Sequence, residues 1–231
     1  MRSWHCDRPE HLLDGVCVLI CVALWGLVAL VGCDGRSGGV PPGPTTSTDT
    51  TITGSVSSGS LPAIPISDAT VSIYRAQAGA PDLVAQAMTD LQGEFVVTLP
   101  NGNGGNLLYA VARKAGAIEL AAVIGTTFAP TLVINELTTV ATAYAMAQWL
   151  DNGVIAGPAP SLQIAAGMAE NLVAAATGTT STVIRSSPNA DETNTQRELA
   201  TLANILAACT QDSPGACPAP VSYTHLRAHE T

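Results

Sequence analysis

In ATVSIYRA (residues 69–76), apolar and polar residues alternate, as expected for a strand with one face in a core. We expect Val71 and Ile73 to face that core, and Thr70 and Ser72 to face outward. Similar short runs lie at 51–56, 83–90, 93–99, 107–114 and 118–123, separated by the turn-forming stretches SSGSLP, QAGAPD, DLQG and PNGNGGN. Regular short strands with turns between them predict an antiparallel β-sandwich with a transthyretin-like or Ig-like fold over residues 51–134.

Part of this region, residues 51–116, resembles the carboxypeptidase regulatory-like domain, a transthyretin-like β-sandwich. The matching stretches are TGSV (53–56), SDATVSIY (67–74), TDLQGEF (89–95) and LLYAVARK (107–114). The resemblance implies an accessory, non-catalytic fold that recurs in secreted and surface proteins. In TDLQGEF we expect Asp90 to accept backbone N–H groups and Gly93 to supply a positive φ. The alternative, a calcium site at Asp90 and Glu94, lacks the six to eight or so oxygens that calcium takes.

A helical pattern begins after a last strand expected within 126–134. In the first helix, 135–150, we expect Asn135 as the N-cap. Its apolar stripe would be Leu137, Val140, Ala141, Tyr144 and Ala147. A second helix is expected over 161–178, capped by Ser161 and stopped by Gly178, and a third over 195–211, opened by a Thr195–Glu198 capping box. The fold class is therefore α+β: a sandwich followed by a small Ala-rich helical module, 135–220.

The helical module carries few polar residues that could form a site. We interpret Asn135, Glu136 and Asn171 as caps or solvated positions. The stretch VINELTTVATAYAMAQ (133–148) resembles a segment of bacterial secreted proteins that carry NHL-type β-propeller repeats further along the chain. This resemblance implies no site residue here.

The N-terminal region reads as an export signal. GVCVLICVALWGLVALVG (15–32) contains no charge, follows Arg2 and Arg8, and leads into LVGC at 30–33. LVGC resembles the lipobox of bacterial lipoproteins, which implies a signal peptide over 1–32 and lipidation of Cys33. Residues 33–50, rich in Gly, Pro, Ser and Thr, are expected to act as a flexible tether. An uncleaved membrane helix is the alternative, and Asp7, Glu10 and Asp14 depart from the usual net-positive start of a signal peptide.

The last eleven residues, VSYTHLRAHET (221–231), resemble the translation of a transposon-end sequencing adapter. They are therefore set aside as an artefact, and the helical module is expected to continue beyond Pro220. Setting them aside removes His225 and His229 from an apparent zinc site with Cys209 and Cys217, because two thiols alone cannot complete tetrahedral zinc. In an exported protein we expect Cys209 and Cys217 to form a disulfide, with free thiols as the alternative.

Composition excludes several kinds of function. The net charge is −9, and the basic residues between 33 and 220 are scattered, so nucleic acid is not an expected partner. The same stretch contains no histidine, which excludes Ser-His-Asp catalysis and histidine-bound zinc. NGNGGN (101–106) runs from strand to strand and is expected to be a hairpin loop, not a phosphate cradle. We expect no catalytic residue, metal or cofactor.

These observations predict a lipid-anchored, non-catalytic protein of the bacterial envelope, exported to the periplasmic or outer face of a membrane. Its β-sandwich would serve as a binding module or as a spacer. The expected partners are the membrane, through the lipid, and polysaccharide or other envelope proteins. The alternative is an accessory N-terminal region of a larger secreted enzyme or β-propeller protein.

Overall fold

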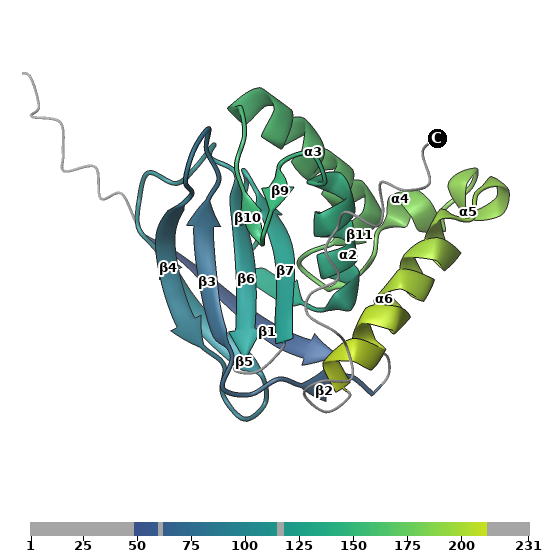
Figure 1. Ribbon diagram of the computed structural model, residues 1–231, viewed down its shortest axis with the longest axis horizontal. Helices are drawn as coiled ribbons and strands as arrows, with labels where there is room; N and C mark the ends of the chain where they lie inside the picture. Colours follow the sequence, from purple (N-terminus) through teal and green to yellow (C-terminus); the bar gives the residue numbers. More distant parts are fainter. Residues whose placement is uncertain (1–48, 60–61, 115–117, 212–231) are drawn as a thin grey trace, which may run out of the picture. The chain divides into compact units, whose positions relative to one another are not determined.

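Eight strands make up the first part of the computed structural model, which describes residues 49–59, 62–114 and 118–211 (Figure 1). They are β1 (Thr50–Ser58), β2 (Ile64–Pro65), β3 (Thr70–Arg75), β4 (Asp82–Met88), β5 (Glu94–Leu99), β6 (Leu108–Lys114), β7 (Ile118–Gly125) and β8 (Thr131–Ile134). Each strand expected from the sequence is found, and most ends lie within two residues of the expected ones. The short strand β2 was not expected.

The strands form two four-stranded sheets. The second sheet has the order β4-β3-β6-β7 and is antiparallel throughout. In the first sheet β1 pairs antiparallel with β2 and β5, but parallel with β8. The expected antiparallel pairing therefore holds for every strand of the two sheets except β8.

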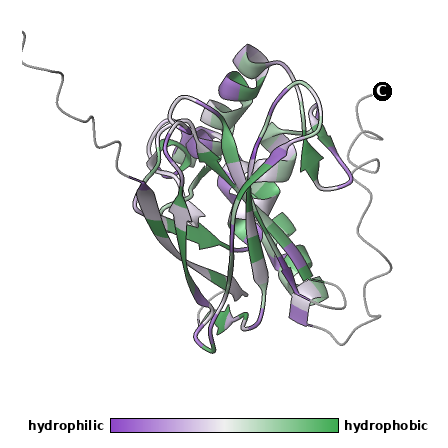
Figure 2. Ribbon diagram, turned by 90° about the vertical axis from the view of Figure 1, so that its left-hand side faces the viewer, coloured by the Kyte–Doolittle hydropathy of each residue, from purple (hydrophilic) through white to green (hydrophobic). Residues whose placement is uncertain are grey.

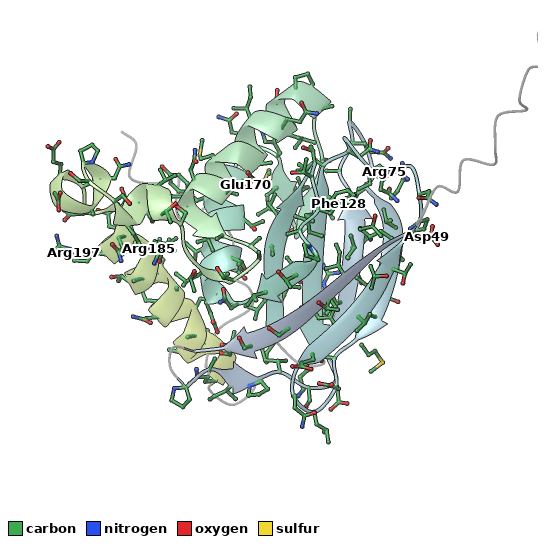
Figure 3. The ribbon with its side chains drawn as sticks, turned by 180° about the vertical axis from the view of Figure 1, so that it is seen from behind. Asp49, Arg75, Phe128, Glu170, Arg185 and Arg197 are labelled. Carbon is green, nitrogen blue, oxygen red and sulfur yellow. The ribbon has the colours of Figure 1, made fainter. Side chains whose placement is uncertain are left out.

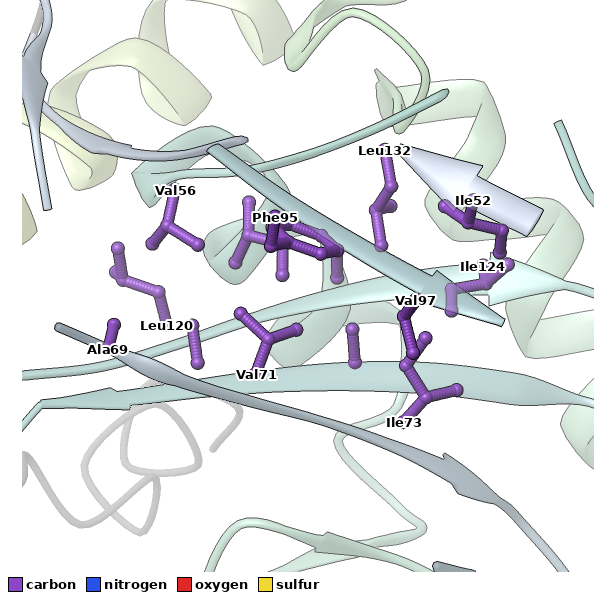
Figure 4. Packing of buried hydrophobic residues seen from close by; sticks show 14 of the residues in the cluster. Ile52, Val56, Ala69, Val71, Ile73, Phe95, Val97, Leu120, Ile124 and Leu132 are labelled. Atoms are coloured by element: carbon purple, nitrogen blue, oxygen red, sulfur yellow. The ribbon is translucent and has the colours of Figure 1, made fainter. Parts of the chain in front are cut away.

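One hydrophobic core lies between the two sheets (Figure 4). Ile52, Phe95 and Leu132 enter it from the first sheet, and Val71 and Ile73 from the second. The inward positions predicted for Val71 and Ile73 are confirmed.

Ser72 faces away from this core, as predicted, but it is buried rather than exposed to solvent. It lies on the other face of the second sheet, where its hydroxyl accepts a hydrogen bond from the Gln86 side chain at 2.8 Å. A neighbouring side chain, rather than water, therefore satisfies this polar group.

Helices and two small hairpins follow the strands. The helices are α2 (Glu136–Ala145), α3 (Ala159–Leu172), α4 (Thr182–Arg185), α5 (Asn189–Glu192) and α6 (Thr195–Gln211). The hairpins pair β9 (Leu150–Asp151) with β10 (Val154–Ile155), and β11 (Val173–Ala174) with β12 (Thr179–Thr180). The α+β class is confirmed. Within the described residues, no helix is long and apolar enough to cross a membrane.

Several helix ends differ from the expected ones. Helix α2 ends at Ala145, where a turn over residues 146–149 leads to β9, and α3 ends at Leu172, because the next residue, Val173, begins β11. Helix α3 starts after Pro158, which makes no side-chain cap bond, so Ser161 is not its cap. The bounds of α6 are as predicted, but Thr195 is its first helical residue rather than its cap.

A second core fills the space between the second sheet and the helices. Tyr109, Val111 and Val123 face Met146 and Leu162 there. Strand β6 is consequently buried on both faces, and the described sheets and helices belong to one compact unit. The change at residue 135 is thus a change of secondary structure inside that unit.

Helix α2 buries threonines as well as part of the predicted apolar stripe, since Leu137 and Val140 are partly buried and pack against a core that contains Ala141. Ala141 of the stripe is buried, but Tyr144 is 63 % exposed and Ala147 is exposed too. The hydroxyl of Thr139 accepts the Ala121 N–H at 2.9 Å, and that of Thr142 accepts the Val123 N–H at 3.1 Å. Both N–H groups belong to β7, so these two threonines seal an edge of the second sheet.

Candidate functional site

The cysteines predicted to carry covalent chemistry lie mostly outside the described residues. Cys33, the expected lipidation site, and Cys217 both fall there. Cys209 lies on α6, is half-buried and takes part in a disulfide bond. Its pairing with Cys217 remains a prediction.

The turn TDLQGEF has the geometry predicted for it. The Asp90 carboxylate accepts the N–H groups of Gln92 at 2.9 Å and Glu94 at 2.8 Å. Gly93 has a φ of +74°, a conformation that side chains with a Cβ resist. Asp90 therefore holds the connection between β4 and β5.

The loop NGNGGN is not a hairpin loop. It joins β5, in the first sheet, to β6, in the second, and these two strands are not paired. The expectation of a hairpin was wrong because sequence shows that two strands follow each other, but not whether they share a sheet.

The cluster around Glu136 is the feature of the described chain that sequence reasoning missed. Asn135 is the N-cap of α2, as predicted, and its side chain accepts the Thr138 N–H at 3.0 Å. Asn171 is exposed, which agrees with a solvated position. Glu136, however, is only 4 % exposed, so its interpretation as a cap or solvated residue was wrong.

The Glu136 carboxylate links three elements. Its oxygens lie 3.1 and 3.2 Å from the N–H of Gly59, just after β1, and Oε1 also accepts the Thr210 hydroxyl of α6 at 3.1 Å. The Thr210 hydroxyl is hydrogen-bonded to that of Ser58 as well. Gly59 has a φ of +82°, which glycine adopts more readily than other residues.

This cluster provides a structural tie rather than a reactive centre. The two ion pairs found among residues 49–59, 62–114 and 118–211 join Arg75 to Asp82 and Arg113 to Glu119, so neither involves Glu136. Nor do the described residues contain a group of three acidic, histidine or cysteine side chains suited to a metal ion. Both carboxylate oxygens are occupied by donors of the protein itself.

A second polar region lies beneath the β9–β10 hairpin. A cavity of about 30 Å³ there is lined by residues that include Tyr109, Glu119, Thr139 and Gly153. This is room for a water molecule or two, far below the roughly 300–1,000 Å³ of a small-molecule pocket.

Two groups with a shifted pKa are associated with this cavity: Tyr109 lines it, and Arg113 is paired with Glu119, which lines it. Burial raises the pKa of the Tyr109 phenol, and the N–H of Ile155, which donates to its oxygen at 3.3 Å, partly offsets the effect. The hydrogen bond to Glu119 raises the pKa of Arg113, whose guanidinium meets that carboxylate at 3.0 and 3.1 Å. The pair is well exposed to solvent and therefore contributes little stability.

No protein-family model matches the chain, and no curated protein matches it either. The resemblances described above therefore stay predictions.

Proposed function

We propose that this chain is a lipid-anchored, non-catalytic protein of the bacterial envelope, with a folded unit that serves as a binding module or as a spacer. The observation that carries the proposal is LVGC at 30–33, whose cysteine directly follows the eighteen uncharged residues 15–32. A Gly-, Pro-, Ser- and Thr-rich stretch then leads to β1 at Thr50. Two or more acyl chains on Cys33 would hold the protein at a membrane stably, since each buried methylene contributes about 0.8 kcal/mol.

For the folded unit we propose a transthyretin-like β-sandwich, of the kind found in carboxypeptidase regulatory-like domains. Its support is the arrangement of the strands: the chain passes from one sheet to the other between β4 and β5, β5 and β6, and β7 and β8. The two sheets share one core, and the Asp90 turn is built as that resemblance implies.

The proposed absence of catalysis is supported by side-chain chemistry. The stretch 33–220 has no histidine to activate a nucleophile. The carboxylate of Glu136 is engaged within the fold, and the cavity beside Tyr109 is too small for a substrate. Binding would therefore use an outer surface, with polysaccharide or another envelope protein as partner.

Metabolic labelling with an alkyne fatty acid tests the anchor. We expect the wild-type chain to take up label and Cys33→Ala to lose it, because the thiol of Cys33 is the proposed acceptor. Cys21→Ala is the matched control: it removes a thiol from the same hydrophobic segment and should keep the label. Equal labelling of wild type and Cys33→Ala would refute the lipid anchor.

A further inference from the structure

The four edge strands of the two sheets differ in whether other parts of the chain form hydrogen bonds to their outward backbone groups. On one side, Thr139 and Thr142 seal β7, and the Ala175 carbonyl accepts the Val133 N–H of β8 at 2.8 Å. On the other side, β4 and β5 end the two sheets, and no described element pairs with either beyond its own sheet. Figure 2 views the unit from this side, where the strands stand in front of the helices.

The backbone of β4 points hydrogen-bonding groups outward. The N–H of Thr89, just after β4, donates to the Ala69 carbonyl at 2.9 Å. Because bonding alternates along an antiparallel pair, Ala87 also bonds toward β3, while the N–H and C=O groups of Gln86 and Met88 point away from it. These outward groups can pair with an added strand.

The side chains along β4 favour such pairing. Leu83 is 55 % exposed and Met88 is 65 % exposed, and Leu91 and Val96 are exposed large apolar residues nearby. Natural edge strands are often blunted by lysine, proline or a bulge. Here Pro81 and a register shift opposite Ile73 and Tyr74 disturb only the first part of β4, so Ala85–Met88 is left regular and free of charge.

Charge decides which kind of strand fits. Asp82 lies at one end of β4, where Arg75 of β3 pairs with it at 3.5 Å, and Asp90 and Glu94 lie just past the other end, so these residues together carry a net negative charge. The basic residues Arg185 and Arg197 belong to helices α4 and α6. In Figure 3 they lie on the opposite side of the molecule from Arg75 and Asp49, which belong to the strand region. A second copy running antiparallel would bring to Asp90 only an Asp82 that Arg75 already pairs, and would offer Asp90 and Glu94 no free basic residue. A strand with basic ends would meet Asp90 and Glu94, which form no ion pair among the described residues, at one end and the half-exposed Asp82 at the other.

We propose that β4 is a docking edge for an extended segment of another protein, alternately apolar along its length and flanked by Lys or Arg. Main-chain hydrogen bonds to Gln86 and Met88 would supply the affinity, and Leu83 and Met88 would contact its apolar side chains. This proposal rests on the binding role proposed for the folded unit. It does not rest on the lipid at Cys33, so each can fail without the other.

The test uses the full-length chain and a fluorescent probe peptide that alternates threonine and valine and carries two lysines at each end. We expect the peptide to bind wild type and to protect the Gln86 and Met88 amides from hydrogen exchange. Gln86→Pro removes an outward N–H and should weaken binding at least tenfold. Met88→Lys, which repels the basic ends, should do the same, whereas Ile205→Lys on α6 is the matched control and should leave binding unchanged.

Two further probe peptides test the specificity of binding to the β4 edge. The same peptide with glutamates at its ends, or with a central proline, should bind at least tenfold more weakly. No binding to wild type, or equal binding to wild type, Gln86→Pro and Met88→Lys, would overturn the proposal. Sedimentation of a dimer that Gln86→Pro converts to monomer would overturn it too, because the occupant would then be a second copy. Met88→Lys keeps the test decisive if Gln86→Pro does not fold.

Discussion

Glu136 is a carboxylate held almost entirely out of water, yet its surroundings compensate for lost hydration. It accepts hydrogen bonds from Gly59 and Thr210, and it sits in the first turn of α2, where the helix dipole favours negative charge. It thereby ties the end of β1 and the end of α6 to the start of α2. Contacts far apart in sequence depend on this one side chain.

We expect Glu136→Ala to lower the free energy of unfolding by about 1–3 kcal/mol, because it leaves the Gly59 N–H without an acceptor and removes one partner of the Thr210 hydroxyl, which keeps the Ala207 carbonyl. Glu136→Gln keeps one acceptor oxygen and should cost less. Urea unfolding followed by circular dichroism measures both. The exposed Glu198 of α6 provides the control, since Glu198→Ala should change stability by no more than about 0.5 kcal/mol. A loss from Glu136→Ala no larger than the control's would contradict the tie.

Tyr109 gives the fold a dependence on alkaline pH. Burial raises its pKa above the ordinary value of 10.0, so the folded state holds the phenol proton more tightly than the unfolded state. Its contribution to stability is therefore complete below pH 10 and is lost as pH rises through the folded pKa. The loss approaches about 1.4 kcal/mol per pH unit between the two pKa values.

Tyr109→Phe should flatten this decline in unfolding free energy above pH 10, although it also removes the acceptor of the Ile155 N–H. Tyr144→Phe, at an exposed position, should leave the decline as in wild type. Denaturant titrations across that pH range measure both slopes. An unchanged slope in Tyr109→Phe would rule out this origin.

At the scale of elements, helix α2 shows what a periodic pattern can and cannot predict. Its start at the Asn135 cap was predicted correctly, because capping is local chemistry. Its buried face was predicted only in part: Leu137, Val140 and Ala141 pack into a core, but the sequence pattern did not reveal that threonines would face β7. The edge of β7 offers unpaired N–H groups, and threonine hydroxyls satisfy them where leucine or tyrosine could not.

Replacing Thr142 with valine keeps the shape of the side chain and removes the acceptor of the buried Val123 N–H. We expect Thr142→Val to destabilise the fold by about 1–3 kcal/mol. Hydrogen exchange at Val123 should become faster. Thr201→Val, on the exposed face of α6, is the matched control and should do neither. Unchanged exchange at Val123 would show that the hydroxyl does not seal the edge.

Helix α3 illustrates a second limit. Its apolar, Ala-rich composition continues past Leu172, so the sequence predicted a helix up to Gly178. Instead Val173 and Ala174 pair with Thr179 and Thr180, and the Gly178 side of that hairpin bonds to Asn135 through its carbonyl. A tertiary contact overrides helix propensity there.

At the scale of the whole molecule, sheets and helices depend on each other. The second sheet has a core on each face, and α2 seals one of its edges. We therefore expect residues 49–134 alone to expose the face of Tyr109 and the β7 edge, and to aggregate or remain unfolded. Residues 49–211 should give a cooperative unfolding transition by circular dichroism. A soluble, cooperatively folded 49–134 fragment would contradict this dependence.

The candidate sites differ in how far sequence could predict them. Cys33 is proposed from a local motif of four residues, which sequence alone displays. The Glu136 cluster joins Gly59, Glu136 and Thr210, more than seventy residues apart from one to the next, and carries no local signal. The open edge of β4 follows from strand order, which alternation along single strands does not reveal.

The pairing of β1 has a mechanical consequence. Its neighbour β8 runs parallel to it, and the chain leaves β8 toward the helices. A force applied to residue 49 while the helical part is held fixed loads β1 and β8 in shear. The hydrogen bonds between the two strands must then break together instead of one after another. We expect this shear geometry to give a high unfolding force, which single-molecule stretching between residues 49 and 135 would measure. A low-force, stepwise opening would contradict it.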